Sequence, residues 1–236
     1  MEHIILPDNI ERPLTFYLAM EEYVAAAYGC GFFIWQVAPT VIIGRNQVLE
    51  TEVNMPFCRL HGIDVVRRKS GGGCVYADRG NLMLSYITPE KGVEAVFREF
   101  LNKFAEALRG IGLPAVCTSH NDITVDGYKV SGNAFFSLPR CSIVHGTLLH
   151  SVDFDMLAAA ITPTEAKLAK HGVQSVRQRV ANLSALGLEL SAGELTDYLT
   201  DVFCDGERRL DDSDIVGIEL IEKSYREPSF ILGKAL

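Results

Sequence analysis

The sequence has little of what would place the protein in a membrane, on nucleic acid or outside the cell. No apolar run approaches the ~18 to 20 residues that a membrane-spanning helix requires. The formal net charge is -8, so general attraction to nucleic acid or to an anionic membrane is not expected. The first residues, MEHIILPDNIERP, include early acidic residues and no long apolar stretch, which does not fit a secretory signal. We therefore predict neither a nucleic-acid partner nor a membrane partner.

The cysteine pattern is also notable for what it lacks. The six cysteines form no CxxC pair and have no zinc-like spacing with a histidine. Scattered thiols in a mid-sized acidic chain are typical of a reducing compartment, and buried packing is the ordinary role for each. These observations predict a cytoplasmic protein.

What is present is enough for one sizeable core, because 48% of the 236 residues are hydrophobic. No internal repeat, low-complexity segment or proline-rich linker divides the chain, so we expect one catalytic domain over 1–236 and no C-terminal accessory domain. Apolar periodicity predicts helices over 14–27 and 93–108, with shorter ones from about 155 and 192. Strand patterns lie at 32–37 and 40–44, expected to form a hairpin, and at 63–68, 82–87, 122–136 and 142–150. A mixed β-sheet with flanking, segregated helices makes an α+β fold.

The segment RRKSGGGCVYADRGN, residues 67–81, places three glycines directly after a cation-rich stretch. Glycine backbone lets N–H groups approach a ligand closely, and consecutive N–H groups can form an anion-binding concavity. Arginine and lysine beside them add contacts to phosphate or carboxylate. Neither GxGxxG nor GxxxxGK[ST] is present, and the residues that follow are strand-like. A glycine-rich turn with a solvated basic flank remains an equally good interpretation of this segment alone.

Two further segments carry polar groups within apolar strands. In NDITVDGYKVSGNA, Asp126-Gly127 predicts a tight hairpin that brings Asp122 and Lys129 near each other on one sheet face. A surface ion pair of little energetic weight is the simpler interpretation of that pair. In SIVHGTLLH, His145 interrupts an apolar strand, and a lone core histidine is more often structural than functional.

Taken together, these segments resemble the lipoate–protein ligase family. The resemblance covers roughly residues 14–185 and rests on six segments in the order of the family: LAMEEY (18–23), VIIGRNQ (41–47), RRKSGGGCVYADRGNLMLS (67–85), NDITVDGYKVSGNA (121–134), HGTLL (145–149) and QSVRQRVANL (174–183). The resemblance implies the fold of the biotinyl/lipoyl protein ligase catalytic domain, distantly similar to class II aminoacyl-tRNA synthetases.

The resemblance also implies a reaction in two steps. Lipoate attacks the α-phosphate of ATP to give lipoyl-AMP and pyrophosphate, and a lysine of an acceptor domain then takes the lipoyl group. Lys129 matches the site lysine of the family, and Asp122 would orient it or hold Mg²⁺. The remaining substrate and ATP-binding residues that the resemblance implies are Arg68, Ser70, Gly71, Gly72, Gly73, Cys74, Val75, Tyr76, Asn81, Asn121, His145, Arg177 and Arg179.

The implied acceptors are lipoyl domains of 2-oxoacid dehydrogenase complexes or the glycine cleavage H protein. A separate accessory protein is a further implied partner, because many ligases of this kind carry an additional C-terminal domain. Two alternatives remain open from the sequence. One is an ATP-independent octanoyl or lipoyl transferase with a cysteine nucleophile, for which Cys117, Cys74 and Cys141 are candidates. The other is a non-catalytic protein that binds lipoyl domains.

Overall fold

The main sheet gives the molecule its frame. The computed structural model describes residues 1–118, 121–162 and 179–233. Within them eight strands form a sheet in the order β11-β1-β2-β6-β10-β9-β8-β7. Their bounds are Glu2–Ile5 (β1), Gly31–Trp35 (β2), Asn81–Thr88 (β6), Ala115–Cys117 (β7), Asp122–Val125 (β8), Tyr128–Ser137 (β9), Ser142–Leu149 (β10) and Gly206–Arg209 (β11). The centre is antiparallel, whereas β1 pairs in parallel with both β2 and β11. The predicted mixed sheet is therefore confirmed.

A smaller sheet of three described strands, ordered β4-β3-β5, carries the glycine segment. It consists of Thr40–Ile43 (β3), Asp64–Arg67 (β4) and Val75–Ala77 (β5). The predicted hairpin of 32–37 with 40–44 is wrong, because β2 pairs with β6 in the main sheet and β3 pairs with β4 and β5. The link through Ala38 and Pro39 has none of the Asn-Gly or Asp-Gly chemistry of a tight hairpin, and it carries the chain from one sheet to the other.

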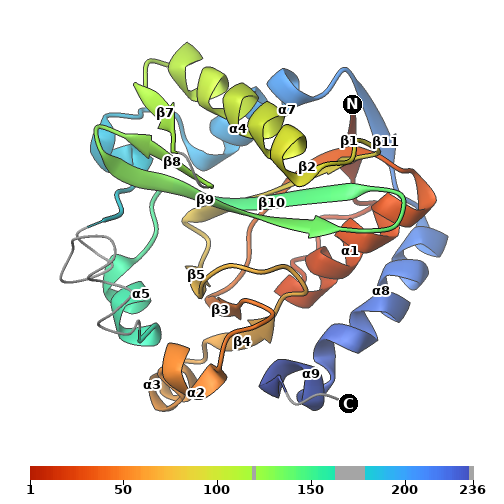
Figure 1. Cartoon of the computed structure of the whole chain (residues 1–236), viewed down its shortest axis with the longest axis vertical. Coiled ribbons are helices and arrows are strands. Elements are labelled where there is room, and N and C mark those ends of the chain that lie inside the picture. The colour runs from red at the N-terminus through yellow and green to blue at the C-terminus, as the bar shows by residue number, and fades with distance from the viewer. Residues whose placement is uncertain (119–120, 163–178, 234–236) are drawn as a thin grey trace.

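Helices cover both faces of the main sheet (Figure 1). The long ones are Leu14–Ala27 (α1), Val93–Gly110 (α4), Ala192–Phe203 (α7) and Asp212–Arg226 (α8). The short ones are Leu49–Glu52 (α2), Met55–Leu60 (α3), Phe154–Ala160 (α5), Pro228–Leu232 (α9) and a 3-10 turn at Leu183–Leu186 (η2). The predicted helices over 14–27 and 93–108 are confirmed. None of the helices in the described ranges is both long and apolar enough to cross a bilayer.

The two faces of the sheet bury different clusters. One face packs against α4 and α7 through side chains such as Phe100, Phe104 and Leu199. The other packs against α1, which is buried along most of its length because α8 covers its outer side. A third cluster lies between the small sheet and α3 and α5. The α1 face is the one that carries the polar groups described below.

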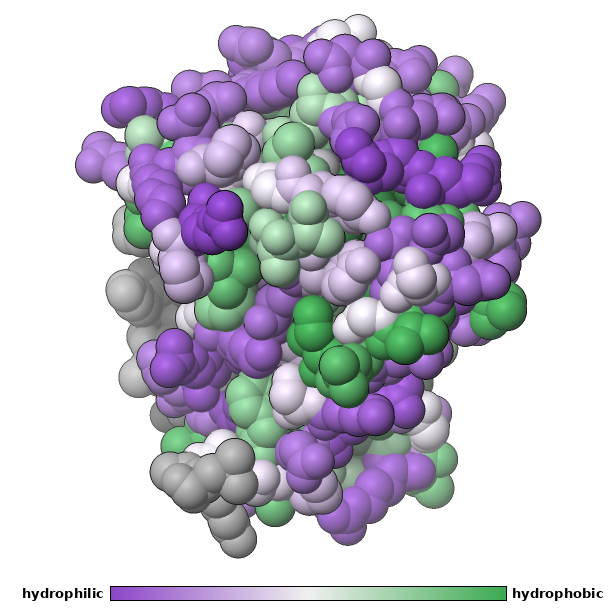
Figure 2. Space-filling model, turned by 90° about the vertical axis from the view of Figure 1, so that its right-hand side faces the viewer, coloured by the Kyte–Doolittle hydropathy of each residue, from purple (hydrophilic) through white to green (hydrophobic). Residues whose placement is uncertain are grey.

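The outer surface of α8 lies on the side of the molecule shown in Figure 2, where hydrophobic side chains gather on a mostly hydrophilic face. The exposed apolar residues of α8 are Val216 and Leu220, which are one helical turn apart.

Candidate functional site

Lys129 and Asp122 meet on the α1 face of the main sheet. Lys129 Nζ lies 2.7 Å from Asp122 Oδ1, and Arg179 donates to Oδ2 of the same carboxylate. Asp122 is buried, and Lys129 retains about a quarter of its side-chain exposure. The pairing across the Asp126-Gly127 turn that the sequence predicts is confirmed.

A β-bulge determines which residue lies opposite Asp122. Ile123 pairs with Ser131 and Thr124 pairs with Lys129, so Val130 is the extra residue of β9. Asp122 consequently pairs with Gly132, whereas a regular hairpin would place Ser131 there. A Cβ on Gly132 would lie 2.5 Å from Lys129 Nζ. The bulge therefore supplies a position without a side chain, and the lysine head occupies that space.

The electrostatic environment of Lys129 combines opposing effects. Burial lowers the pKa of Lys129, Asp122 acts in the opposite direction, and Arg179 and Arg68 lower this pKa further. The backbone of the segment that carries Arg179 runs beside Lys129, with Lys129 N–H donating to Arg179 O at 2.9 Å and Ala181 N–H donating to Lys129 O at 3.1 Å. Arg68 and Arg179 are therefore neighbours of the same lysine. The prediction for Arg177 lies outside the described residues.

The three cations at 67–69 alternate in direction, as side chains of an extended chain do. Arg68 turns back over the glycines and donates to the carbonyl groups of Gly71 and Gly73, each at 2.7 Å. Arg67 is buried and donates to Gly44 O at 2.9 Å, to Gln47 O at 2.8 Å and, near the end of α9, to Ile231 O at 3.0 Å. Of the two arginines, Arg68 is the one directed at the glycine loop.

Lys69 faces the C-terminal helices. Its Nζ lies 2.7 Å from Glu22 Oε1, which also accepts a 2.5 Å hydrogen bond from Tyr225 OH. The same Nζ lies 4.5 Å above the Tyr225 ring, an additional cation–π contact. Burial raises the pKa of Tyr225, and nearby Glu22 raises it further. Lys69 thus connects the glycine segment to α1 and α8 and is neutralised there.

The glycine loop presents its backbone outward. Gly71, Gly72 and Gly73 are exposed, and their N–H groups find no acceptor among the described residues. Gly72 has φ of +93°, which favours glycine. A side chain on Gly44 would collide with Gly72 O, so the loop packs directly on the backbone that follows β3. The loop therefore has the unpaired donors that an anion-binding turn requires.

The residues after the glycines have different environments. Cys74 and Val75 are half-buried against the neighbouring clusters, and Tyr76 is buried in the core beneath the small sheet. Burial raises the pKa of Tyr76, with Asp78 and Asp153 adding to the effect. Tyr76 is therefore placed as a packing residue under the loop.

Ser70 and His145 belong to one buried hydrogen-bonded chain. His145 Nε2 lies 2.6 Å from Ser70 Oγ, and His145 Nδ1 lies 2.8 Å from Glu21 Oε2. Glu21 Oε1 accepts a 2.6 Å bond from Ser85 Oγ, to which Trp35 Nε1 donates at 2.9 Å. His145 is therefore not an isolated core histidine, because it joins the glycine segment to α1.

The two asparagines of the predicted set differ from each other. Asn121 donates to Asn133 O, and the Asn133 amide in turn donates to Asn121 O at 3.0 Å. This reciprocal pair closes the edge of β8 against β9. Asn81 is fully buried, and neither polar atom of its amide has a partner among the described residues. An unpaired buried amide of this kind is costly unless water or a ligand completes it.

Asp122, the predicted magnesium ligand, does not belong to a cluster of metal-ligating side chains among the described residues. No group of three histidine, cysteine or acidic side chains in the described ranges could hold a metal. Asp122, the predicted ligand, already has a cation on each carboxylate oxygen. A divalent ion at Asp122 would therefore compete with Lys129 and Arg179 for the same carboxylate.

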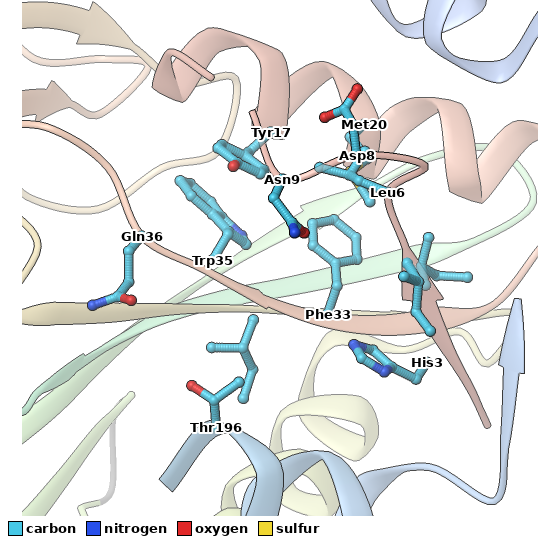
Figure 3. Close-up of a pocket in the computed structure, with 13 residues that line it drawn as sticks. His3, Leu6, Asp8, Asn9, Tyr17, Met20, Phe33, Trp35, Gln36 and Thr196 are labelled. Atoms are coloured by element: carbon cyan, nitrogen blue, oxygen red, sulfur yellow. The ribbon is translucent and has the colours of Figure 1, made fainter. Parts of the chain in front are cut away.

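A hollow between the N-terminal segment and β2 lies outside this constellation (Figure 3). It has a volume of about 320 Å³, and its wall includes Trp35 and Tyr17, whose rings stack with centroids 4.6 Å apart. Neither Arg68 nor Lys129 lines it. The Trp35 indole thus has one side in this hollow and its N–H in the buried chain that leads to Ser70.

Comparison with known proteins decides the family. A model of the lipoyl protein ligase A/B catalytic domain matches residues 13–204. The chain belongs to this family. Lipoate–protein ligase 1 of Staphylococcus aureus is 41% identical over 180 residues, which are 75% of this chain and 55% of that protein. Lipoate-protein ligase A of Psychrobacter cryohalolentis is 31% identical over 225 residues, 93% of this chain and 65% of that protein. The chain thus spans less than two thirds of the length of either relative.

Solved structures of the lipoyl protein ligase family superpose over the whole chain. A bi-partite lipoate protein ligase from Thermoplasma acidophilum has a TM-score of 0.85 at 26% identity and covers 100% of this chain and 98% of its own. A lipoate-protein ligase A bound with ATP has a TM-score of 0.84 at 25% identity and covers 100% of both chains. The α+β fold that the resemblance implies is confirmed.

Sequence reasoning missed several residues that organise the site. Glu21 and Glu22 come from α1 and Tyr225 comes from α8, both far in sequence from the glycine segment, whereas Ser85 comes from β6, which follows that segment. The available signal for Glu21 was a carboxylate within the apolar run of 14–27, because such a carboxylate requires a partner wherever the helix is buried. Nothing local marked Tyr225 as a partner of the glycine segment.

Proposed function

We propose that this chain activates lipoate with ATP to lipoyl-AMP and transfers the lipoyl group to a lysine of a lipoyl-acceptor domain. The observation that carries the proposal is the convergence of Arg68, Lys129 and the unpaired N–H groups of the glycine loop. Arg68, which directly follows a strand of the small sheet, is close enough to Lys129 in the main sheet to lower the pKa of that lysine. Family membership and the ATP bound to a structural relative support the same activity.

The chemistry accounts for the arrangement. A carboxylate oxygen must approach the α-phosphorus of ATP, and these two groups repel each other in water. Lys129 would offset charge on both the acyl oxygen and the phosphate, while Arg68 and the N–H groups of Gly71, Gly72 and Gly73 stabilise the oxygen charge that develops. The bond to pyrophosphate breaks, and the acyl group is left on AMP. In the second step an amine attacks the acyl carbon and AMP leaves.

Asp122 would hold Lys129 in place rather than bind a metal. Arg179 shares that carboxylate, so the nucleotide phosphates could draw Arg179 from Asp122 when they arrive. Mg²⁺ would then enter bound to the nucleotide phosphates. The other assigned contacts, Ser70 with Cys74 and Val75 at the loop and Asn81 with His145 beneath it, belong to the acyl-binding part of the proposal. The unpaired Asn81 amide supports an acyl or water partner there.

The acceptor is proposed to be a small lipoyl domain of a 2-oxoacid dehydrogenase complex or the glycine cleavage H protein. The Thermoplasma relative was described together with its E2 lipoyl domain, which supports this class of partner. A separate accessory protein is included in the proposal, because that relative is bi-partite.

Exchange of labelled pyrophosphate into ATP tests the first step. We expect exchange that requires lipoate, measured with the purified chain alone and with an added accessory protein from the same source. A Lys129→Met sample serves as the matched blank. Absence of exchange under both conditions, together with transfer from an acyl thioester donor, would contradict the ligase assignment.

A cysteine variant tests the transferase alternative. Cys117 Sγ donates to Leu101 O on the α4 side of the sheet, and burial raises the pKa of its thiol, which disfavours the reactive thiolate. We expect Cys117→Ala to transfer lipoate in the presence of ATP within about twofold of the wild-type rate. A stable acyl adduct on Cys117, found by mass spectrometry, would move the chain to the transferase class.

A further inference from the structure

In the buried series of hydrogen bonds from Trp35 to Ser70, the donor and the acceptor of each bond can be assigned. The Trp35 indole can only donate, so Ser85 Oγ accepts from it and its own hydrogen points to Glu21. The Glu21 carboxylate can only accept, so His145 Nδ1 carries the hydrogen that faces it. In the neutral ring Nε2 is then an acceptor, and Ser70 Oγ–H must donate to it. Each hydrogen bond between Trp35 and Ser70 therefore has one possible direction.

This arrangement is that of an activated serine. A hydroxyl at 2.6 Å from a histidine nitrogen, with the opposite nitrogen 2.8 Å from a carboxylate, is the nucleophile, base and orienting acid found in serine acyl-transfer enzymes. Three separate elements supply the groups: the glycine segment, β10 and α1. All three side chains are buried, so water does not compete for these bonds.

The backbone beside Ser70 supplies N–H donors for an oxyanion, which acyl transfer also requires. The adjoining N–H groups of Gly71, Gly72 and Gly73 have no acceptor among the described residues, and they follow Ser70 directly. Donors in this position can stabilise the oxyanion of a tetrahedral intermediate. The cysteines offer no equivalent, since Cys117 and Cys141 hydrogen-bond to backbone carbonyl groups.

We propose that Ser70 is a catalytic nucleophile and that the chain has an ATP-independent acyl-ester hydrolase activity toward medium-chain acyl groups. Ser70 Oγ attacks the carbonyl carbon of an activated ester, its proton passes to His145 Nε2, and the alcohol or phenol of the ester leaves with that proton. Water then attacks the acyl-serine, His145 takes the proton of that water and returns it to Ser70 Oγ as the acyl–oxygen bond breaks, and the free acid is released. Glu21 is a positioning residue that keeps His145 in the reactive tautomer.

The acyl class rests on the proposed ligase function, whereas the nucleophile rests on the hydrogen-bonded chain alone. Ser70 itself is 2% exposed, so the glycine loop must shift for an ester to reach it. Glycine backbone permits such a shift at little steric cost. The activity is therefore expected to be slow, in keeping with a residue that also lies beneath an acyl-adenylate.

The test uses p-nitrophenyl octanoate without nucleotide, and every variant is checked for folding by circular dichroism. We expect measurable hydrolysis by the wild-type chain, a fall of at least ~10²-fold in Ser70→Ala and in His145→Gln, and no change in the matched control Ser137→Ala, an exposed serine at the end of β9. Glu21→Gln should lower kcat at least tenfold and change KM for the ester less than threefold, because Glu21 does not contact the ester.

A second measurement does not depend on a variant that folds. An alkyl fluorophosphonate should label the wild-type chain on Ser70, as read by peptide mass spectrometry. Labelling elsewhere only, no hydrolysis by the wild-type chain, or hydrolysis by folded Ser70→Ala within threefold of wild type would each overturn the proposal. Lipoate-dependent pyrophosphate exchange, measured on the same wild-type sample, reports separately on the ligase function.

Discussion

Lys129 is the residue on which the proposed ligase chemistry depends most directly. We expect Lys129→Met to lower lipoyl-AMP formation by ~10²-fold or more, the scale of a lost electrostatic stabiliser. The cost in unfolding free energy should stay below about 2 kcal/mol, because Asp122 keeps its bond to Arg179. Lys223→Met, on the exposed side of α8, is the matched control. Rapid adenylate formation by the variant would remove Lys129 from the mechanism.

Gly132 is predicted to control adenylate formation through Lys129, although it has no side chain to contribute. An alanine there would place its Cβ 2.5 Å from Lys129 Nζ, so the lysine head would have to leave Asp122. We expect Gly132→Ala to lower adenylate formation ~10-fold to 10²-fold in a folded protein. Gly193→Ala is the control, because the nearest atom to its added Cβ is 4.0 Å away. Equal rates for both alanine variants would show that the bulge position does not control the lysine.

At the scale of elements, α8 should stabilise the glycine segment through Tyr225. Tyr225→Phe removes the bond to Glu22 and leaves the ring under Lys69. We expect a loss of about 1 to 2 kcal/mol, or roughly 2–4 °C in Tm for each kcal/mol in a chain of this size. Tyr128→Phe, at an exposed tyrosine, should be neutral.

The pH dependence of the stability loss in Tyr225→Phe tests whether the missing hydroxyl group causes that loss. The folded pKa of Tyr225 is raised, so its stabilising contribution is fully present below the ordinary tyrosine pKa of about 10 and declines as the pH rises above it. The difference in unfolding free energy between wild type and Tyr225→Phe should therefore shrink between pH 9 and pH 11 in urea titrations. A difference that stays constant over that range would mean that the lost hydroxyl acts in another way.

The same elements show which parts of the fold could be predicted from the sequence. The β8–β9 hairpin was predictable because Asp126 and Gly127 both adopt positive φ, which their residue types signal. The bulge at Val130 was not, since its residue is apolar and fits either register. The predicted β2–β3 hairpin was wrong, because two strands that are adjacent in sequence can join different sheets. The partners Glu21 and Tyr225 needed tertiary structure, because no local pattern relates α1 and α8 to the glycine loop.

At the scale of the whole molecule, we expect ligand binding to slow amide hydrogen exchange in the glycine loop. The backbone N–H groups of Gly71, Gly72 and Gly73 are exposed and unpaired with described residues, so they should exchange with solvent rapidly in the empty protein. Lipoate with Mg-ATP should protect them, because phosphate and acyl oxygens would then accept their bonds. Hydrogen exchange followed by mass spectrometry measures this directly.

We expect the segment at 179–181 to respond to ligand differently from the glycine loop. Residues up to 178 lie outside the described ranges, but Arg179 and Ala181 already bond to the backbone of Lys129. Protection at 179–181 should therefore be present before ligand is added and change little. Slow exchange at the glycine loop in the empty protein would mean that the site is preformed.

The edge of the main sheet has a consequence for synthesis on the ribosome. Residues Glu2–Ile5 lie between β2 and β11, and β11 begins about 200 residues later. At ~5–20 residues per second, the first strand waits ~10 to 40 s for that neighbour to emerge. During that interval β1 has an open parallel edge, and Glu2 and the amino group of Met1 lack Arg208 and Asp205. The edge of β1 that β11 later covers is therefore open to mispairing during that interval, and a chaperone that binds extended segments would protect it.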